Sequence, residues 1–152
     1  MKHPIAGQET AFDARAWRAG LAGRWRVTRE IADAIGPDGR FDGEAVFSEA
    51  PGGLDYVERG VLRLGGAVLQ AERRALWRAE GPRVAVFFAD GRPFHTFDPA
   101  APRPEARHVC GADVYVVAYD CAFWPHWETV WRVHGPRKDY RMVTRHARPA
   151  AP

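Results

Sequence analysis

The sequence lacks a long apolar run, and its first ten residues, MKHPIAGQET, contain no apolar segment of the kind found in a secretion signal. No stretch approaches the roughly 20 apolar residues that a helix needs to cross a bilayer. We therefore expect a soluble, cytoplasmic protein that has no membrane partner.

The sequence is also poor in cysteine, with Cys110 and Cys121 as the only two. Because thiols stay reduced in the cytoplasm, we expect both to be free. A chain of 152 residues can bury a hydrophobic core without disulfide or metal support. We expect one globular domain over residues 1–152, with its core at about residues 21–148 and flexible termini.

The sequence has no concentrated basic segment and no signature catalytic loop. Its 22 Lys and Arg residues and 19 Asp and Glu residues give a formal charge of +3, and the arginines are scattered along the chain. A nucleic-acid partner is not expected, because binding along a phosphate backbone needs clustered positive charge. The absence of a serine-hydrolase elbow, a Walker loop and a glycine-rich dinucleotide fingerprint argues against several large enzyme classes.

What the sequence does contain is a repeated alternation of apolar and polar residues. Trp25, Val27 and Ile31 alternate with polar neighbours in residues 24–31, which is typical of a half-buried strand. A short amphipathic helix is expected before it, within residues 10–21, and the proline-rich residues 99–107 predict a loop. The alternation recurs at residues 41–47, 54–64, 68–79, 83–89, 92–97, 113–121, 127–134 and 138–146.

Glycine- and proline-containing turns separate most of these segments, so the strands form an antiparallel meander. A flat sheet of this size would expose long edges, and closure removes them. The predicted fold is an all-β, antiparallel, up-and-down barrel of about eight to ten strands with a short N-terminal helix.

Three charged residues, Arg29, Glu58 and Arg73, fall on the apolar faces of predicted strands. An unpaired buried charge is costly, so these groups must meet one another, water or a ligand. One interpretation is a structural network with Glu58 between the two arginines. The other is a binding site for a partly apolar, anionic ligand, since two guanidinium groups against one carboxylate leave a positive charge. Small residues on the same faces would leave room for it: Gly43, Ala45, Gly60, Ala71 and Ala75.

Other side chains supply candidates for chemistry. Trp131 shares a strand face with Trp127, either as core or as a wall for stacking. The residues available for acid–base catalysis are His95, His108, Asp113, Tyr115 and Tyr119, whose mutual distances the sequence leaves open. The inner face of residues 113–121 also stays open, because apolar residues occupy both parities.

No metal site is favoured. The candidate ligands would be His108, Cys110 and Asp113, because His108 and Cys110 are two residues apart and point to one face of an extended chain. The spacing is not that of a zinc finger or ribbon. The identity of a cofactor is open, and none is expected.

Three stretches in fixed order resemble an uncharacterised family known as domain of unknown function 6314. They are ADGRPFH at residues 89–95, HVCGADVY at 108–115 and WRVHGPRKDY at 131–140. The resemblance extends over most of the chain, and it implies no established activity.

A second resemblance concerns the fold. Gly23, Arg24 and Trp25 are similar to the Gly-x-Trp opening of the first strand in lipocalin-like, or calycin, barrels. The resemblance implies that Trp25 closes one end of the barrel and that an arginine from a late strand packs over it. Arg141 and Arg145 are the residues that could fill this role.

The last predicted hairpin turns at Gly135 and Pro136, which places Lys138 and Tyr140 on the inward parity of the final strand. One interpretation is a charged hairpin tip that protects an edge. The resemblance at this position favours the other, in which Lys138 lies at the rim of a binding site.

Our first hypothesis is a calycin-like barrel that binds a small, partly apolar, anionic molecule, with a homodimer left open. One alternative is an enzyme on the same barrel, an isomerase, cyclase or lyase, that uses the His, Asp and Tyr candidates. The other is haem or tetrapyrrole binding through a histidine, because barrels of this size accommodate such rings. The candidate ligand-binding residues are Arg29, Glu58, Arg73, His95, Tyr115, Trp131, Lys138 and Tyr140.

Overall fold

The computed structural model of the chain describes residues 11–150. A single 3-10 turn, η1 (Ala14–Ala16), leads into the short helix α2 (Trp17–Leu21), and ten strands follow. No helix in residues 11–150 has the length and hydropathy needed to cross a bilayer. The strands are β1 (Gly23–Asp33), β2 (Gly39–Ala50), β3 (Gly53–Leu64), β4 (Ala67–Glu80), β5 (Arg83–Phe88), β6 (Pro93–Phe97), β7 (Glu105–Cys110), β8 (Asp113–Asp120), β9 (Trp127–Gly135) and β10 (Lys138–Ala147).

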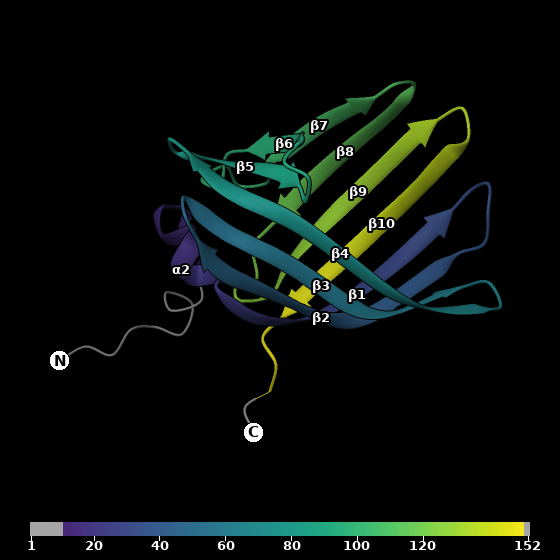
Figure 1. Cartoon of the computed structure of the whole chain (residues 1–152), viewed down its shortest axis with the longest axis horizontal. Coiled ribbons are helices and arrows are strands. Elements are labelled where there is room, and N and C mark those ends of the chain that lie inside the picture. Colours follow the sequence, from purple (N-terminus) through teal and green to yellow (C-terminus); the bar gives the residue numbers. More distant parts are fainter. Residues whose placement is uncertain (1–10, 151–152) are drawn as a thin grey trace.

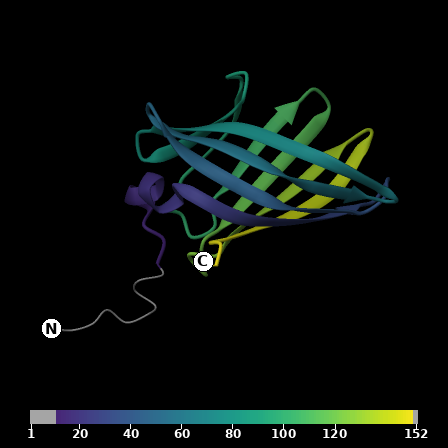
Figure 2. The same ribbon diagram turned by 60° about the horizontal axis from the view of Figure 1, so that its bottom comes forward.

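All ten strands belong to one antiparallel sheet with the order β6-β5-β4-β3-β2-β1-β10-β9-β8-β7. Strands that follow one another in the sequence pair with each other, except β6 and β7, and β1 also pairs with β10. The sheet curls into a nearly closed barrel, with β6 and β7 approaching each other at the seam (Figures 1 and 2). The predicted all-β, up-and-down barrel with a short N-terminal helix is thus confirmed.

The strands differ in length, which leaves one end of the barrel less enclosed. Helix α2 lies at one end, and β5 and β6 end well before the far hairpins of β1–β4 (Figure 1). The wall of the barrel is therefore shorter on the β5–β6 side of the far end.

Two elements differ from the sequence prediction. Strand β7 begins at Glu105, inside the region 99–107 that was predicted as a loop. Its alternation is short and directly follows prolines, so periodicity alone does not reveal it. The predicted helix is reduced to η1 and α2, because Asp13 caps η1 through the backbone N–H of Arg15 and the chain leaves the helix after Leu21. Thr10, the first residue of the predicted helix, lies outside the described residues.

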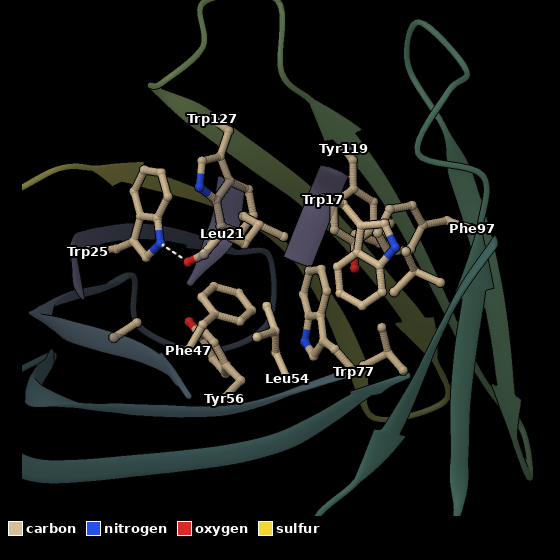
Figure 3. Close-up of a cluster of buried hydrophobic side chains, with 14 of the residues drawn as sticks. Trp17, Leu21, Trp25, Phe47, Leu54, Tyr56, Trp77, Phe97, Tyr119 and Trp127 are labelled. Atoms are coloured by element: carbon tan, nitrogen blue, oxygen red, sulfur yellow. Dashed lines mark hydrogen bonds between the residues drawn. The ribbon is translucent and has the colours of Figure 1, made fainter. Parts of the chain in front are cut away.

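Trp25 closes the α2 end of the barrel. Its ring is fully buried, and its Nε1 donates a hydrogen bond to the carbonyl oxygen of Leu21 at 2.8 Å (Figure 3). The guanidinium of Arg148 lies 3.8 Å from the centre of the ring and donates to the carbonyl oxygens of Gly20, Ala22 and Arg24. The expected arginine over the tryptophan is therefore present.

The two residues predicted for that role, Arg141 and Arg145, were both wrong. Arg141 and Arg145 are exposed, and Arg145 contacts the carboxylates of Glu30 and Glu128. Their parity in β10 places them on the outer face. Arg148 reaches Trp25 because it follows the last residue of β10, where the alternation no longer applies.

Aromatic rings fill the interior next to this end (Figure 3). Trp77 packs edge-on against Phe47, Phe97 and Tyr119, with ring centres 5.1 to 6.1 Å apart. These rings form the part of the core that lies next to the α2 end of the barrel.

Candidate functional site

A buried ion pair joins β1 and β3 across the interior. Arg29 donates two hydrogen bonds of 2.8 Å to the two carboxylate oxygens of Glu58, and its Nε donates to Oγ1 of Thr144 at 2.7 Å. The hydroxyl of Tyr56 donates to Glu58 Oε1 at 2.7 Å. Burial raises the pKa of Glu58, but the hydrogen bonds and charge of Arg29 outweigh it and lower this pKa to about 2. The pair is ionised and its two charges cancel.

Arg73 does not join this pair. It is the register partner of Glu58 in the β3–β4 ladder, yet the carboxylate hydrogen-bonds to Arg29, which lies beyond β2. Arg73 is exposed, and no carboxylate among residues 11–150 lies within ion-pair distance of it. The positive charge predicted for the interior is therefore found at its solvent edge, on Arg73.

A small cavity of about 50 Å³ lies beside the ion pair and is named the inner cavity here. Its walls include Arg29, Glu58, His95 and Trp131. The Nε2 of His95 and the hydroxyl of Tyr119 are 2.6 Å apart. The interior of the barrel is thus mostly filled, with space for only a few ligand atoms.

A larger pocket of about 240 Å³ opens at the far end and is named the mouth pocket. Phe94 stacks on Trp131 with ring centres 5.0 Å apart and an interplanar angle of 10°. Phe94 also stacks on Phe88 at 4.4 Å. Four residues line both this pocket and the inner cavity, so the two are adjacent: Arg73, Ala75, Phe94 and Trp131. The complete wall comprises Arg73, Arg74, Ala75, Phe87, Phe88, Phe94, Tyr115, Trp131, Tyr140 and Met142.

A second cation contacts the wall of the mouth pocket from outside it. The Nζ of Lys138 lies 2.8 Å from the hydroxyl of Tyr115 and 3.1 Å from a carboxylate oxygen of Asp113. Tyr115 and Tyr140 line the pocket, as the inward parity of β8 and β10 requires. Lys138 therefore follows the parity that was predicted for it and contacts a pocket-lining tyrosine.

Two small residues do not leave the room that was expected of them. Gly43 and Gly60 face each other in the β2–β3 ladder, and the ring of Phe41 lies over both. A Cβ on Gly60 would lie 2.7 Å from that ring and would collide with the carbonyl oxygen of Asp42. These glycines permit close packing of backbone and ring, whereas Ala75 does border open space.

The predicted acid–base residues do not form one group. His95 contacts Tyr119, and Asp113 forms an ion pair with Lys138. The ring of His108 packs edge-on against Phe94 at 5.1 Å. Tyr115, the remaining candidate, contacts Lys138.

The candidate metal ligands also stay apart. Within the described part of the chain, no three His, Cys, Asp or Glu side chains are grouped as a metal site would require, so His108, Cys110 and Asp113 do not assemble one. Cys110 is exposed, Cys121 is half-buried, and both are free thiols.

Several residues of the site were not identified from the sequence. Tyr56 and Thr144 hydrogen-bond to the ion pair, and His146 stacks on Trp127 with ring centres 3.7 Å apart. Tyr56 had a usable signal, since it lies two residues from Glu58 on the same strand face. Thr144 had one only after the register of β1 with β10 is known, because it is the register partner of Arg29.

Three other pockets are larger but differ in chemistry, and the largest, of about 570 Å³, is lined by residues that include Asp33, Arg132 and Asp139. A pocket of about 440 Å³ at the α2 end is lined by apolar and small residues that include Phe12, Phe97 and Cys121, and no charged residue lines it. A pocket of about 390 Å³ lies beside Phe123 and Arg148. The mouth pocket combines stacked rings with Arg73, a cation that has no carboxylate partner among the described residues, and it adjoins the polar inner cavity.

The two buried histidines predict a pH-dependent stability. Burial lowers the pKa of His95 and His146 to about 3 from an ordinary value of 6.5. Between these values the unfolded chain binds more protons than the folded protein, so stability falls as the pH falls. We expect urea unfolding at a series of pH values to show a slope of at most about 2.7 kcal/mol per pH unit between pH 6 and 4, which corresponds to two protons. The depressed pKa of Glu58 adds a further loss below pH 4.5.

The variant His95→Phe provides the control, because it removes one of the two protons and should reduce the slope by about half. A free energy of unfolding that stays constant from pH 7 to pH 4 would show that these imidazoles are not held neutral by burial.

Comparison with solved structures supports the fold assignment. The chain superposes on the S-type phycobiliprotein lyase CPES from Guillardia theta with a TM-score of 0.63, covering 98% of this chain and 100% of that chain. The sequence identity is 9%, so the likeness concerns the fold alone. No curated protein matches the sequence.

Comparison with sequence families gives a more specific result. Residues 21–148, which include all ten strands in full, match the family described as "Family of unknown function (DUF6314)". The match covers the barrel from the end of α2 to the arginine that packs over Trp25. The chain therefore belongs to the DUF6314 family.

Proposed function

We propose that the barrel binds a partly apolar, conjugated small molecule that carries a carboxylate, and that linear tetrapyrroles are the ligand class. The observation that carries the proposal is the mouth pocket, where stacked aromatic rings lie beside Arg73, a cation without a carboxylate partner among the described residues. An aromatic wall favours a flat conjugated molecule, and the guanidinium fork of Arg73 fits a carboxylate.

The size of the site supports partial enclosure of the ligand. Pockets for small molecules usually measure about 300–1,000 Å³. The mouth pocket of about 240 Å³ and the inner cavity of about 50 Å³ together fall slightly below this range. A linear tetrapyrrole would place one end in the barrel, while the rest would extend past the shorter strands β5 and β6.

The structural likeness agrees with this ligand class. The similar fold belongs to a phycobiliprotein lyase, whose name refers to proteins that carry bilins. Histidine-ligated haem has less support, because His95 is held by Tyr119 and His146 is stacked on Trp127. A linear tetrapyrrole needs no axial ligand and can use Arg73 and the aromatic wall instead.

Two measurements test the proposal. Native mass spectrometry of the freshly purified protein should reveal a retained conjugated acid. Titration with biliverdin should then quench the tryptophan fluorescence with a Kd of about 10 μM or lower, because Trp131 lies in the pocket wall. Biliverdin dimethyl ester is the matched control, since it lacks the carboxylates and should bind about tenfold more weakly or worse. Equal binding of acid and ester, or no quenching at about 100 μM, would contradict the proposal.

A further inference from the structure

One residue in the wall of the inner cavity carries a buried polar atom that has no hydrogen-bond partner among the described residues. His95 lines this cavity and is only 8% exposed. Its Nε2 lies 2.6 Å from the hydroxyl of Tyr119, whereas its Nδ1 is buried and has no hydrogen-bond partner among the described residues. A buried polar atom without a partner is destabilising. The imidazole of His95 borders the inner cavity, so a ligand that enters this cavity can supply the missing partner after a small shift of the ring.

The hydrogen bond to Tyr119 determines which proton the imidazole carries. Tyr119 is buried, and Nε2 of His95 is the one acceptor in the described structure within hydrogen-bonding distance of its hydroxyl. If this hydroxyl donates to Nε2, the proton of the neutral ring is on Nδ1. The opposite tautomer would leave the hydroxyl hydrogen of Tyr119 and the lone pair of Nδ1 both unsatisfied. The arrangement therefore favours Nδ1–H, a hydrogen-bond donor.

The surroundings of Nδ1 determine whether a charged or an uncharged ligand group can accept its hydrogen bond. Arg29 is neutralised by Glu58, and the Glu58 carboxylate borders the same cavity. A buried carboxylate from a ligand would lack a free cation there and would meet the charge of Glu58. Burial and the charge of Arg73 lower the pKa of His95 to about 3, so the ring stays uncharged near neutral pH. An uncharged oxygen is the acceptor that suits this end.

We infer that His95, positioned by Tyr119, is a specificity-determining residue that donates a hydrogen bond from Nδ1 to a carbonyl oxygen at the buried end of the ligand. The inference rests on the proposed function and fixes the direction of binding, with the carbonyl end inside and the carboxylate at Arg73. The ligand class is thereby narrowed to conjugated acids that carry a carbonyl group remote from the carboxylate.

The first test needs no ligand. Long-range ¹H–¹⁵N correlation spectra of the full ¹⁵N-labelled chain report which imidazole nitrogen carries the proton. We expect His95 to be protonated at Nδ1 and unprotonated at Nε2 at neutral pH. The Tyr119→Phe variant, which keeps the ring but loses the hydroxyl, should lose this preference. A wild-type ring protonated at Nε2 would overturn the inference whether or not the protein binds tetrapyrroles.

The second test compares two ligands that differ in one functional group. The probes are 6-acetyl-2-naphthoic acid and 6-isopropenyl-2-naphthoic acid, which share the ring and the carboxylate, and only the first has a carbonyl. We expect the acetyl compound to bind the wild type up to about tenfold more tightly, as one hydrogen bond predicts. The difference should disappear in His95→Phe, and Arg73→Met should weaken both probes by the same factor.

The outcomes separate the two proposals. Equal binding of both probes to the wild type, with both weakened by Arg73→Met, would overturn the role of His95 and leave the proposed function standing. Failure of both probes to bind would contradict the proposed function and the inference that rests on it. If His95→Phe does not fold, the tautomer and the wild-type affinity ratio still decide the question.

Discussion

Replacement of Arg29 with methionine should lower the free energy of unfolding by about 3–5 kcal/mol, the usual result of breaking a buried ion pair. Glu58 is only 2% exposed, and its carboxylate would keep just the hydrogen bond from Tyr56. The lost hydrogen bond to Thr144 adds to the effect. Urea unfolding followed by tryptophan fluorescence at neutral pH measures the change.

Two further variants separate the causes of this loss. The double variant Arg29→Met with Glu58→Leu should recover most of the stability, because apolar side chains of similar volume then replace both charges. Arg40→Met provides the exposed control, since Arg40 pairs with Asp42 in solvent and should leave the stability nearly unchanged. If Arg29→Met unfolds like the wild type, the ion pair is not buried as described.

Replacement of Arg73 with methionine should weaken the binding of biliverdin by about 10- to 100-fold, because a hydrogen-bonded charge pair is lost. The stability should change little, since Arg73 is exposed and no carboxylate in the described chain pairs with it. The main effect of Arg29→Met is thus expected on stability, and the main effect of Arg73→Met on affinity. Fluorescence titration measures the affinity.

Arg59→Met is the matched control for this prediction. Arg59 is on the outer face of β3, where it contacts Glu72, and it lines none of the pockets described above. Its replacement removes the same charge but should leave the affinity for biliverdin unchanged. An equal loss of affinity in Arg59→Met and Arg73→Met would indicate that net charge, and not a contact at the mouth, determines binding.

The fold could be predicted from the sequence because its strands have one buried and one exposed face. Alternation identified nine of the ten strands, and turn residues such as Gly135 and Pro136 placed the reversals. Strand β7 escaped this method because it is short and follows a proline-rich loop. The arginine over Trp25 was assigned to the wrong position because Arg148 lies beyond the alternating part of β10.

The candidate site could be predicted only in part, because parity gives the face of a side chain but not its partner. Arg29, Glu58 and Arg73 were all assigned to inner faces. In the ladder Glu58 is paired with Arg73, yet the curvature of the barrel brings the buried Arg29 to the carboxylate from two strands away. Such contacts depend on register and curvature, which a single sequence does not specify.

The position of open space in the interior was also hard to predict from the sequence. Gly43, Gly60 and Ala75 are all small and on inner faces, but only Ala75 borders open space, because the ring of Phe41 covers the two glycines. Side-chain size therefore predicts space only when the neighbouring ring is also placed. His95 and Tyr119 were both candidates for acid–base catalysis, but the sequence does not show that they pair, because the contact depends on β6 and β8 facing each other across the interior.

The most direct test of the proposed site is to map biliverdin on the protein by amide chemical-shift changes in ¹⁵N-labelled full-length chain. Binding at the mouth predicts that the largest changes cluster on Arg73, Ala75, Phe94, Tyr115 and Trp131. Changes that cluster instead on Phe12, Phe97 and Cys121, in the larger apolar pocket beside α2, would contradict the account.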